Sequence, residues 1–182
     1  MEPDIARLVA HLTEYAVRTD GPFTLRSGEI SDWYIDARQT TFSGSGSGLV
    51  GAAVLSVLED EVTAAGGLTM GADPIAVAIA LVAASRGREL RAFSVRKADK
   101  DHGTGGRLVG PVSAGDAVAV LEDTTTTGGA LVEAISVARA EGLRVVQAIS
   151  LVDRSGGRVS ERVSGLGIPY RMLVTPSDLG VG

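Results

Sequence analysis

Two adjacent carboxylates, Glu122 and Asp123, are followed directly by four threonines and two glycines in the run Glu122–Gly129. Threonine hydroxyls and the backbone N–H groups of a glycine-rich loop can bind a phosphate, and the N-terminus of a helix adds a favourable dipole. Carboxylates do not suit a phosphate alone. They suit a ligand that also carries sugar hydroxyls or a metal ion beside its phosphate. The run therefore predicts a site for a phosphorylated sugar.

The segments on either side of this run must position it. The apolar residues Ala117–Leu121 predict a buried strand, and Leu131, Ile135 and Ala138 recur at helical spacing. We therefore expect Glu122–Gly129 to be a tight polar loop between the end of a strand and the start of a helix.

A second polar segment, Arg96–Pro111, interrupts the apolar pattern. A solvated charged loop is the simplest interpretation. The alternative is a mobile cationic lid over a polyphosphate, because the cations are concentrated in an otherwise acidic chain and the glycines can act as hinges. The segment contains Arg96, Lys97, Lys100, His102 and Arg107, with Gly103, Gly105 and Gly106.

Strand-like and helix-like segments alternate from Ala52 onward. This pattern predicts an α/β fold in which a mainly parallel sheet carries helices on both faces and binds ligands at the carboxyl ends of its strands. Four polar segments follow strands and should meet at that edge: Met70–Pro74, Arg96–His102, Glu122–Gly129 and Asp153–Arg154.

The part of the chain before this alternation is harder to interpret. An amphipathic helix is expected around residues 5–16, followed by short β-prone segments within Phe23–Gly28 and Ser31–Arg38. Trp33 predicts local core, with a ligand-facing aromatic as the alternative. The run Ser43–Gly48 has the composition of a flexible linker, and we expect a loop that leads into a helix around Leu49–Leu58.

Composition limits the class of protein. The 182 residues are 45% apolar and 21% charged, which is typical of one globular domain. The net charge of −5 argues against nucleic-acid binding. The sequence has no cysteine, which excludes disulfides and fits a cytoplasmic protein. We expect neither a signal peptide nor a membrane span.

Several motifs resemble a known family. Glu122–Ala130 resembles the phosphoribosyl pyrophosphate (PRPP) motif of type I phosphoribosyltransferases, which has two acids, two variable residues, Thr-Thr or Thr-Ala, Gly and a small residue. Arg96–Gly106 closely resembles the catalytic loop of the orotate phosphoribosyltransferase family. Phe23–Gly28 with Tyr34–Asp36 resembles its N-terminal substrate segment, and Asp153–Arg154 resembles its orotate-contacting pair. Leu68–Pro74 looks like an actinobacterial branch.

The resemblance implies a fold and a reaction. The fold is the type I phosphoribosyltransferase fold, as a single domain over residues 1–182, with an N-terminal helix and small hood in about residues 1–42 and a flexible catalytic loop. The reaction transfers the phosphoribosyl group from PRPP to orotate, giving orotidine 5′-monophosphate and diphosphate in UMP biosynthesis. The family is cytoplasmic, uses Mg²⁺ and forms homodimers in which the catalytic loop reaches the neighbouring subunit's site.

The resemblance also implies residue roles. Glu122 and Asp123 hold the ribose hydroxyls, directly or through the magnesium shell, and Asp123 contacts the metal only through PRPP or water. The 5′-phosphate lies among Thr124, Thr125, Thr126, Thr127, Gly128, Gly129 and Ala130, and the pyrophosphate contacts Arg96, Lys97, Lys100 and His102. The expected catalytic residues are Lys100, His102 and Asp123. Orotate contacts Arg154, Thr126 and, less securely, Arg26, which replaces the family's usual Lys.

Two other functions fit part of these motifs. A phosphoribosyltransferase for adenine, hypoxanthine or uracil would keep Glu122–Ala130 but would need neither the Arg96–Gly106 loop nor Arg154. A non-catalytic sensor of PRPP would usually add a DNA-binding module or a basic face, and the sequence shows neither. The sequence therefore favours the orotate enzyme.

Overall fold

A six-stranded sheet forms the centre of the computed structural model, which describes residues 2–24, 28, 30–98 and 106–182. Its strand order is β10-β9-β8-β5-β6-β7, and every neighbouring pair is parallel except β6 and β7. The predicted mainly parallel sheet is therefore confirmed. The strands are β5 (Ala64–Leu68), β6 (Arg91–Val95), β7 (Leu108–Val109), β8 (Ala117–Thr125), β9 (Arg144–Asp153) and β10 (Tyr170–Val174).

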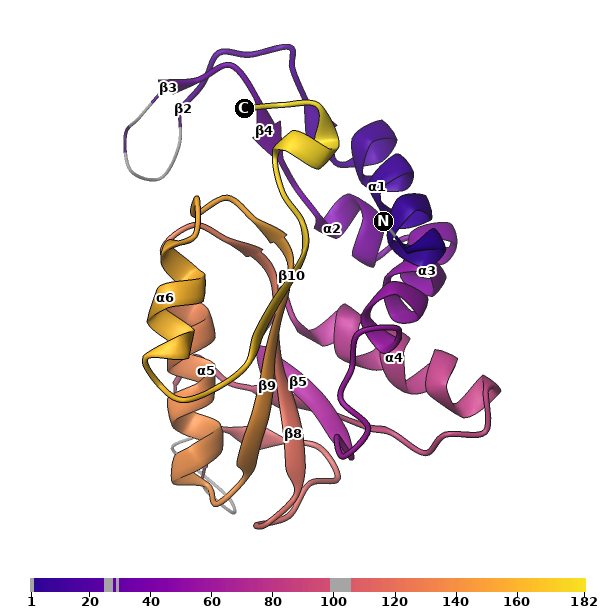
Figure 1. Ribbon diagram of the computed structural model, residues 1–182, viewed down its shortest axis with the longest axis vertical. Helices are drawn as coiled ribbons and strands as arrows, with labels where there is room; N and C mark the ends of the chain where they lie inside the picture. Colours follow the sequence, from indigo (N-terminus) through magenta and orange to yellow (C-terminus); the bar gives the residue numbers. More distant parts are fainter. Residues whose placement is uncertain (1, 25–27, 29, 99–105) are drawn as a thin grey trace.

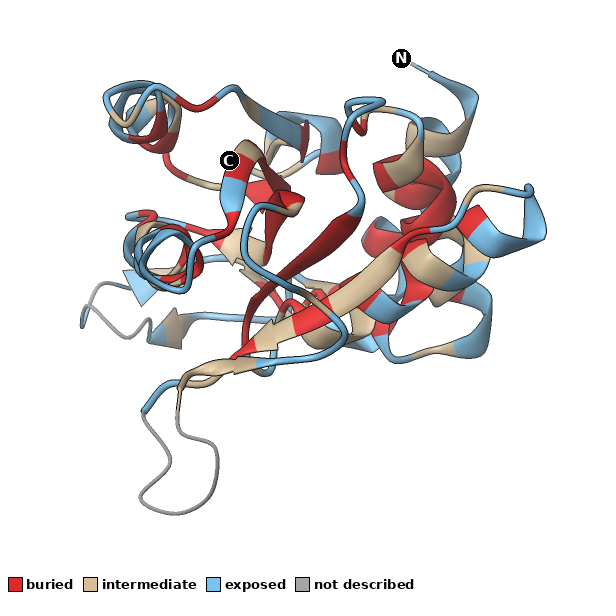
Figure 2. Ribbon diagram, turned by 90° about the horizontal axis from the view of Figure 1, so that it is seen from below, coloured by how far each residue is buried: buried red, intermediate tan, exposed pale blue. Residues whose placement is uncertain are grey.

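Helices cover both faces of this sheet (Figure 1). The side chains of β8 alternate between two hydrophobic cores: Val118 and Val120 pack with α5 and α6, whereas Ala119 and Leu121 pack with α3 and α4. Buried residues accordingly concentrate in the sheet and on the helix faces turned toward it (Figure 2). The helices are α1 (Pro3–Tyr15), α3 (Gly44–Leu55), α4 (Asp73–Ser85), α5 (Gly129–Ala140) and α6 (Arg158–Ser164).

A small hood of short strands lies beyond the carboxyl end of the sheet (Figure 1). It consists of two antiparallel pairs, β1 with β4 and β2 with β3. Helix α1 packs on α3 and leads directly into β1, the first strand of the hood. The remaining elements are β1 (Val17–Arg18), β2 (Phe23–Thr24), β3 (Ile30–Ser31), β4 (Tyr34–Ile35), α2 (Arg38–Thr41) and the 3₁₀ turn η1 (Ser177–Leu179). None of the helices in the described ranges has both the length and the hydrophobicity to cross a membrane.

The expected loop at Ser43–Gly48 is wrong, because helix α3 begins at Gly44. Ser43 caps the helix, and its Oγ accepts a hydrogen bond of 2.9 Å from the Gly46 backbone N–H. Two of the glycines in α3 allow close packing: a Cβ added at Gly46 would lie 2.4 Å from the Thr40 carbonyl oxygen, and one at Gly51 would lie 2.6 Å from that of Ala78 on α4. Tertiary packing therefore outweighs the low helix propensity of glycine.

Two other boundaries differ from expectation. Strand β8 does not end at Leu121 but continues to Thr125, because β9 runs alongside it as far as Asp153, which pairs with Thr125. The carboxylates and the first threonines are therefore strand residues. The segment after Arg96 also contains β7, which pairs antiparallel with β6. Both differences depend on pairing partners that are distant in the sequence.

The sheet order places a topological switch point at the carboxyl ends of β5 and β8. The chain leaves β5 through α4 toward β6 on one side, and leaves β8 through α5 toward β9 on the other. Because β5 and β8 are neighbours, the two connections diverge between them. Open α/β sheets bind ligands where neighbouring strands diverge in this way.

Candidate active site

The four polar segments selected from the sequence lie at or directly after the carboxyl ends of β5, β6, β8 and β9, which are on the same side of the sheet. Two contacts show how closely they approach. The Arg154 backbone N–H donates a hydrogen bond of 2.8 Å to the Thr125 carbonyl oxygen. A Cβ added at Gly71, after β5, would lie 2.7 Å from Asp123 Oδ1. A larger residue at position 71 would force the Asp123 carboxylate to move.

The carboxylate pair lies at the centre of this edge. Glu122 is buried, with 8% of its surface exposed, and its Oε2 has no hydrogen-bond partner in the described part of the chain. Burial and the negative charge of Asp123 raise the pKa of Glu122 to about 8, and the positive charge of Lys97 opposes this rise. Asp123 Oδ1 accepts a hydrogen bond of 2.7 Å from the Thr124 backbone N–H.

The threonine–glycine turn leads from β8 into α5. Thr125 is buried, whereas Thr126 and Thr127 are exposed at the surface of the turn. Gly128, the residue before the helix, has φ of 73°, a conformation that residues with a side chain rarely adopt. Gly129 and Ala130 then form the first turn of α5, so the expected phosphate segment ends at a helix N-terminus.

The end of β9 is held by a buried polar cluster. Asp153 is 3% exposed, and its carboxylate accepts hydrogen bonds from the Ser155 backbone N–H at 2.7 Å and from the Tyr170 hydroxyl at 3.0 Å. Burial raises the pKa of Tyr170 to about 12, so its hydroxyl stays a donor. Asp153 therefore fixes the backbone at the end of β9, and its neighbour Arg154 extends to the hood, where its guanidinium lies over the Trp33 ring.

The cationic segment begins directly after β6. Arg96 and Lys97 are described, whereas Lys100 and His102 lie outside the described residues. Arg107 connects the two ends of the segment and joins it to α5. Its Nε donates a hydrogen bond of 2.7 Å to the Arg96 carbonyl oxygen, and its Nη2 binds the Glu133 carboxylate on α5. Arg107 is thus a structural cation, and the sequence alone did not separate it from its neighbours.

Of three further residues, Asp73, Arg26 and Arg38, the structure describes the first and the last. Asp73 accepts a hydrogen bond of 2.6 Å from the Thr69 hydroxyl, which agrees with a structural role. Arg26, a candidate for orotate, lies outside the described residues. Sequence reasoning missed Arg38 of α2, which pairs with Asp36 at 2.6 Å. The carboxylates of Asp36 and, more weakly, Asp123 raise the pKa of Arg38.

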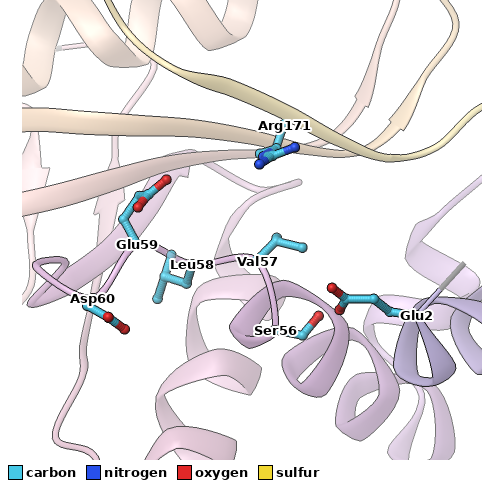
Figure 3. A pocket seen from close by; sticks show the side chains of 7 residues that line it. All are labelled: Glu2, Ser56, Val57, Leu58, Glu59, Asp60 and Arg171. Atoms are coloured by element: carbon cyan, nitrogen blue, oxygen red, sulfur yellow. The ribbon is translucent and has the colours of Figure 1, made fainter.

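Another pocket lies at the opposite edge of the sheet (Figure 3). Glu59 and Asp60 in its wall precede β5, and Arg171 is the second residue of β10. The pocket therefore belongs to the amino ends of the strands, and none of the predicted site residues lines it.

The described residues offer a partial set of metal ligands. They include no cluster of three or more acidic, His or Cys side chains. Glu122 and Asp123 supply two adjacent carboxylates, and Glu122 Oε2 is a buried oxygen without a hydrogen-bond partner among the described residues. Mg²⁺ commonly takes one or two protein carboxylates and completes its shell with substrate phosphates and water. The pair therefore fits a magnesium ion that arrives with a phosphorylated substrate.

The chain is similar to curated proteins along nearly its whole length. It is 44% identical over 162 residues to orotate phosphoribosyltransferase of Streptomyces avermitilis, which covers 88% of this chain and 89% of the relative. It is 42% identical over 177 residues to orotate phosphoribosyltransferase of Corynebacterium glutamicum, which covers 97% of this chain and 94% of the relative. No family model matches the chain.

Solved structures agree with these relatives. Orotate phosphoribosyltransferase of Mycobacterium tuberculosis, in complex with Fe(III) dicitrate, superposes with a TM-score of 0.87 at 36% identity and covers 98% of this chain and 100% of that chain. The same enzyme in complex with PRPP gives a TM-score of 0.82 at 32% identity, with 98% and 100% covered. On this similarity of sequence, fold and length, the chain belongs to the orotate phosphoribosyltransferase family.

Proposed function

We propose that this chain transfers the phosphoribosyl group of PRPP to orotate, yielding orotidine 5′-monophosphate and diphosphate in UMP biosynthesis. One observation carries the proposal: the phosphate-type turn and Arg154 are at the carboxyl ends of two neighbouring strands, β8 and β9, which are joined there by the hydrogen bond between Arg154 and Thr125. Such neighbours could bind a sugar phosphate and a planar anion side by side. Membership of the family supports this assignment.

The PRPP half of the site would be the β8–α5 turn. The 5′-phosphate would bind the backbone N–H groups and hydroxyls of Thr124–Ala130 at the positive end of the α5 dipole. Glu122 and Asp123 would bind the ribose hydroxyls. The PRPP complex of the M. tuberculosis enzyme, which is 32% identical, supports this assignment of substrate.

The orotate half of the site would lie between β9 and the hood. Orotate is a planar anion with a carboxylate, and the planar guanidinium of Arg154 can bind such a group through two parallel hydrogen bonds. Thr126 is exposed and directly follows Thr125, which pairs with Asp153 of β9, so Thr126 would face the base. Arg26 would add a further cation from the hood.

The reaction would break the bond between the anomeric carbon and the diphosphate oxygen and form a bond from that carbon to an orotate nitrogen. The sugar develops oxocarbenium character, so the protein must stabilise the departing negative charge and hold the nitrogen in line. Arg96, Lys97, Lys100 and His102 would neutralise the diphosphate. Lys100 would make the main catalytic contribution, and His102 would protonate the leaving group.

Magnesium would be the metal cofactor, held beside Glu122 and Asp123 through PRPP oxygens or water. When bound, it would neutralise charge on the diphosphate and make it a better leaving group. Asp123 would orient the ribose from the protein side, which is why we count it among the catalytic residues. The short hydrogen bond from the Thr124 N–H supports a fixed orientation of its carboxylate.

We further propose a cytoplasmic homodimer in which each catalytic loop serves the partner's site. Val77 and Leu81 lie four residues apart on α4 and are 52% and 68% exposed, an apolar pair that suits an interface between copies of this chain. Arg96, Lys100 and His102 would act in trans, and Lys97 in its own subunit. Residues 1–182 would form one domain.

An absorbance assay tests the proposed reaction. Purified protein with Mg²⁺ and PRPP should consume orotate, seen as a loss of orotate absorbance. Asp123→Asn should lower kcat/KM for PRPP by at least about 100-fold, because it weakens both ribose binding and charge stabilisation. Asp60→Asn removes an equal charge at the opposite edge and should leave the rate unchanged. Turnover of adenine or uracil in place of orotate would contradict the assignment.

A further inference from the structure

The contact between Trp33 and Arg154 joins the hood to the sheet. The Arg154 guanidinium carbon lies 4.1 Å from the centre of the Trp33 ring, so the cation covers the face of the indole. The two residues come from different parts of the fold: Trp33 lies between β3 and β4, and Arg154 directly follows β9. No sequence motif predicts the contact between these two residues.

Trp33 is itself held in place. The Ser31 hydroxyl donates a hydrogen bond of 2.8 Å to the Trp33 carbonyl oxygen, which fixes the backbone of the turn. The indole is half-buried and packs against the larger hydrophobic core. Because both backbone and ring are constrained, the indole face offers a rigid support rather than a side chain that adapts to Arg154.

The backbone of Arg154 is fixed from the other side. Its N–H donates a hydrogen bond of 2.8 Å to the Thr125 carbonyl oxygen. The carboxylate of the preceding residue, Asp153, accepts hydrogen bonds from the Ser155 backbone N–H and the Tyr170 hydroxyl. Arginine nevertheless has a long flexible stem with about 2 kcal/mol of rotamer entropy. A fixed backbone therefore does not fix the guanidinium, whereas contact with the indole restricts the plane of that group.

Stacking and carboxylate binding use different parts of a guanidinium. An aromatic ring contacts its face, and a carboxylate accepts hydrogen bonds from the N–H groups along its edge. Both contacts can therefore exist together. An arginine supported on its face presents its edge in a preset direction and loses less freedom when an anion binds.

We propose that Trp33 is a positioning residue for the acceptor base: its indole holds the Arg154 guanidinium with its edge toward the carboxylate of orotate. The inference rests on the proposed function, because Arg154 is the base-binding arginine in that proposal. It adds a residue of the hood to base recognition, and it makes the hood turn between β3 and β4 part of the specificity for an acidic base.

Steady-state kinetics of three variants test the role of Trp33. Trp33→Leu keeps an apolar side chain but removes the aromatic face, and it should raise KM for orotate by roughly 2- to 30-fold, the range expected for loss of a cation–π contact. KM for PRPP and kcat should change less than twofold. Trp33→Phe restores an aromatic face and should recover most of the orotate affinity. Tyr15→Leu removes an exposed aromatic from α1 and should change neither KM.

Fluorescence gives a second readout, because Trp33 is the only tryptophan in the chain. Orotate added to the wild type should change the emission of Trp33 after correction for absorbance with free N-acetyltryptophanamide. The change should disappear in Arg154→Ala, where the indole no longer reports on the base-binding side chain. Circular dichroism of each variant verifies folding, and the wild-type titration decides the question if Trp33→Leu does not fold.

The outcomes separate the two proposals. A wild type that does not turn over orotate contradicts the proposed function. A wild type that uses orotate, combined with an unchanged KM for orotate in Trp33→Leu or an unchanged wild-type emission on orotate binding, contradicts the role of Trp33 alone. Equal rises in KM for both substrates, without recovery in Trp33→Phe, would assign Trp33 a structural role only.

Discussion

Glu122 is a carboxyl group in an environment that disfavours its charge. It is buried beside Asp123, and one of its oxygens lacks a hydrogen-bond partner among the described residues. Burying an unpaired carboxylate is costly, so the group keeps its proton to a higher pH than usual. A position of this kind is typical of a site that awaits a ligand, because an incoming hydroxyl or cation can satisfy the free oxygen.

The raised pKa predicts a pH dependence of stability. The pKa of Glu122 moves from an ordinary 4.5 to about 8 on folding, so between these values the folded chain keeps a proton that the unfolded chain has lost. The contribution of Glu122 to the free energy of unfolding should therefore be highest below about pH 4.5 and fall as pH rises to about 8. Glu122→Gln cannot titrate, and its melting temperature should exceed that of the wild type increasingly from pH 5 to pH 8.

Differential scanning calorimetry of the ligand-free protein at several pH values measures this difference. Asp60→Asn, an exposed carboxylate at the opposite edge, serves as the control and should follow the wild-type curve. Parallel curves for the wild type and Glu122→Gln would show that Glu122 titrates normally and that its burial has no effect on its charge.

Helix α3 shows how glycine can act in two ways within one element. Gly51 faces α4, and a Cβ there would lie 2.6 Å from the Ala78 carbonyl oxygen. Gly48 has no heavy atom within 4 Å of an added Cβ. The first glycine therefore allows the helices to pack closely, whereas the second only lowers helix propensity.

This difference predicts opposite effects of the same substitution. Gly48→Ala should stabilise the protein by about 0.5–1 kcal/mol, which corresponds to a rise of roughly 1–4 °C in melting temperature. Gly51→Ala should lower the melting temperature, because its methyl group must displace the backbone of α4. Thermal unfolding followed by circular dichroism compares the two variants. Similar shifts in both would show that α3 and α4 do not pack closely at Gly51.

At the scale of the whole molecule, the sequence predicted what depends on local pattern and motif. The alternation of strands and helices predicted the mainly parallel sheet. The polar segments at the ends of β5, β6, β8 and β9 predicted where a ligand would bind. The parts that were missed depend on partners far away in the chain. Ser43 and the following glycines have the composition of a linker, but they form a helix because α2 and α4 pack closely against Gly46 and Gly51. Strand β8 extends to Thr125 because that residue pairs with Asp153 of β9.

The same limit applies to the site. The carboxylates and the threonines could be predicted because they form one continuous motif. Arg154 could be predicted because the Asp153–Arg154 pair resembles a motif of the family. The sequence could not indicate that Arg107 binds the Glu133 carboxylate, or that the Arg154 guanidinium lies over the Trp33 ring. Each of these contacts joins separate elements, so it exists only once the sheet and the hood have formed.

Mixing two inactive variants tests the proposed sharing of the catalytic loop. If the loop acts in trans, a hybrid dimer of Lys100→Ala and Asp123→Asn contains one intact site. Random exchange at equal concentrations makes half of the dimers hybrid, so about a quarter of wild-type activity should return. Each variant mixed with itself is the control. No recovery, in a mixture shown by native mass spectrometry to contain hybrids, would mean that the loop acts in its own subunit.

Competition between bases in a single tube tests the central claim most directly. Purified protein, Mg²⁺ and PRPP are incubated with equal concentrations of orotate, uracil, adenine and hypoxanthine, and the nucleotides and diphosphate are quantified by chromatography. The account predicts orotidine 5′-monophosphate as the dominant nucleotide, formed one-to-one with diphosphate. A nucleotide of any other base as the main product, or diphosphate release without nucleotide, would contradict it.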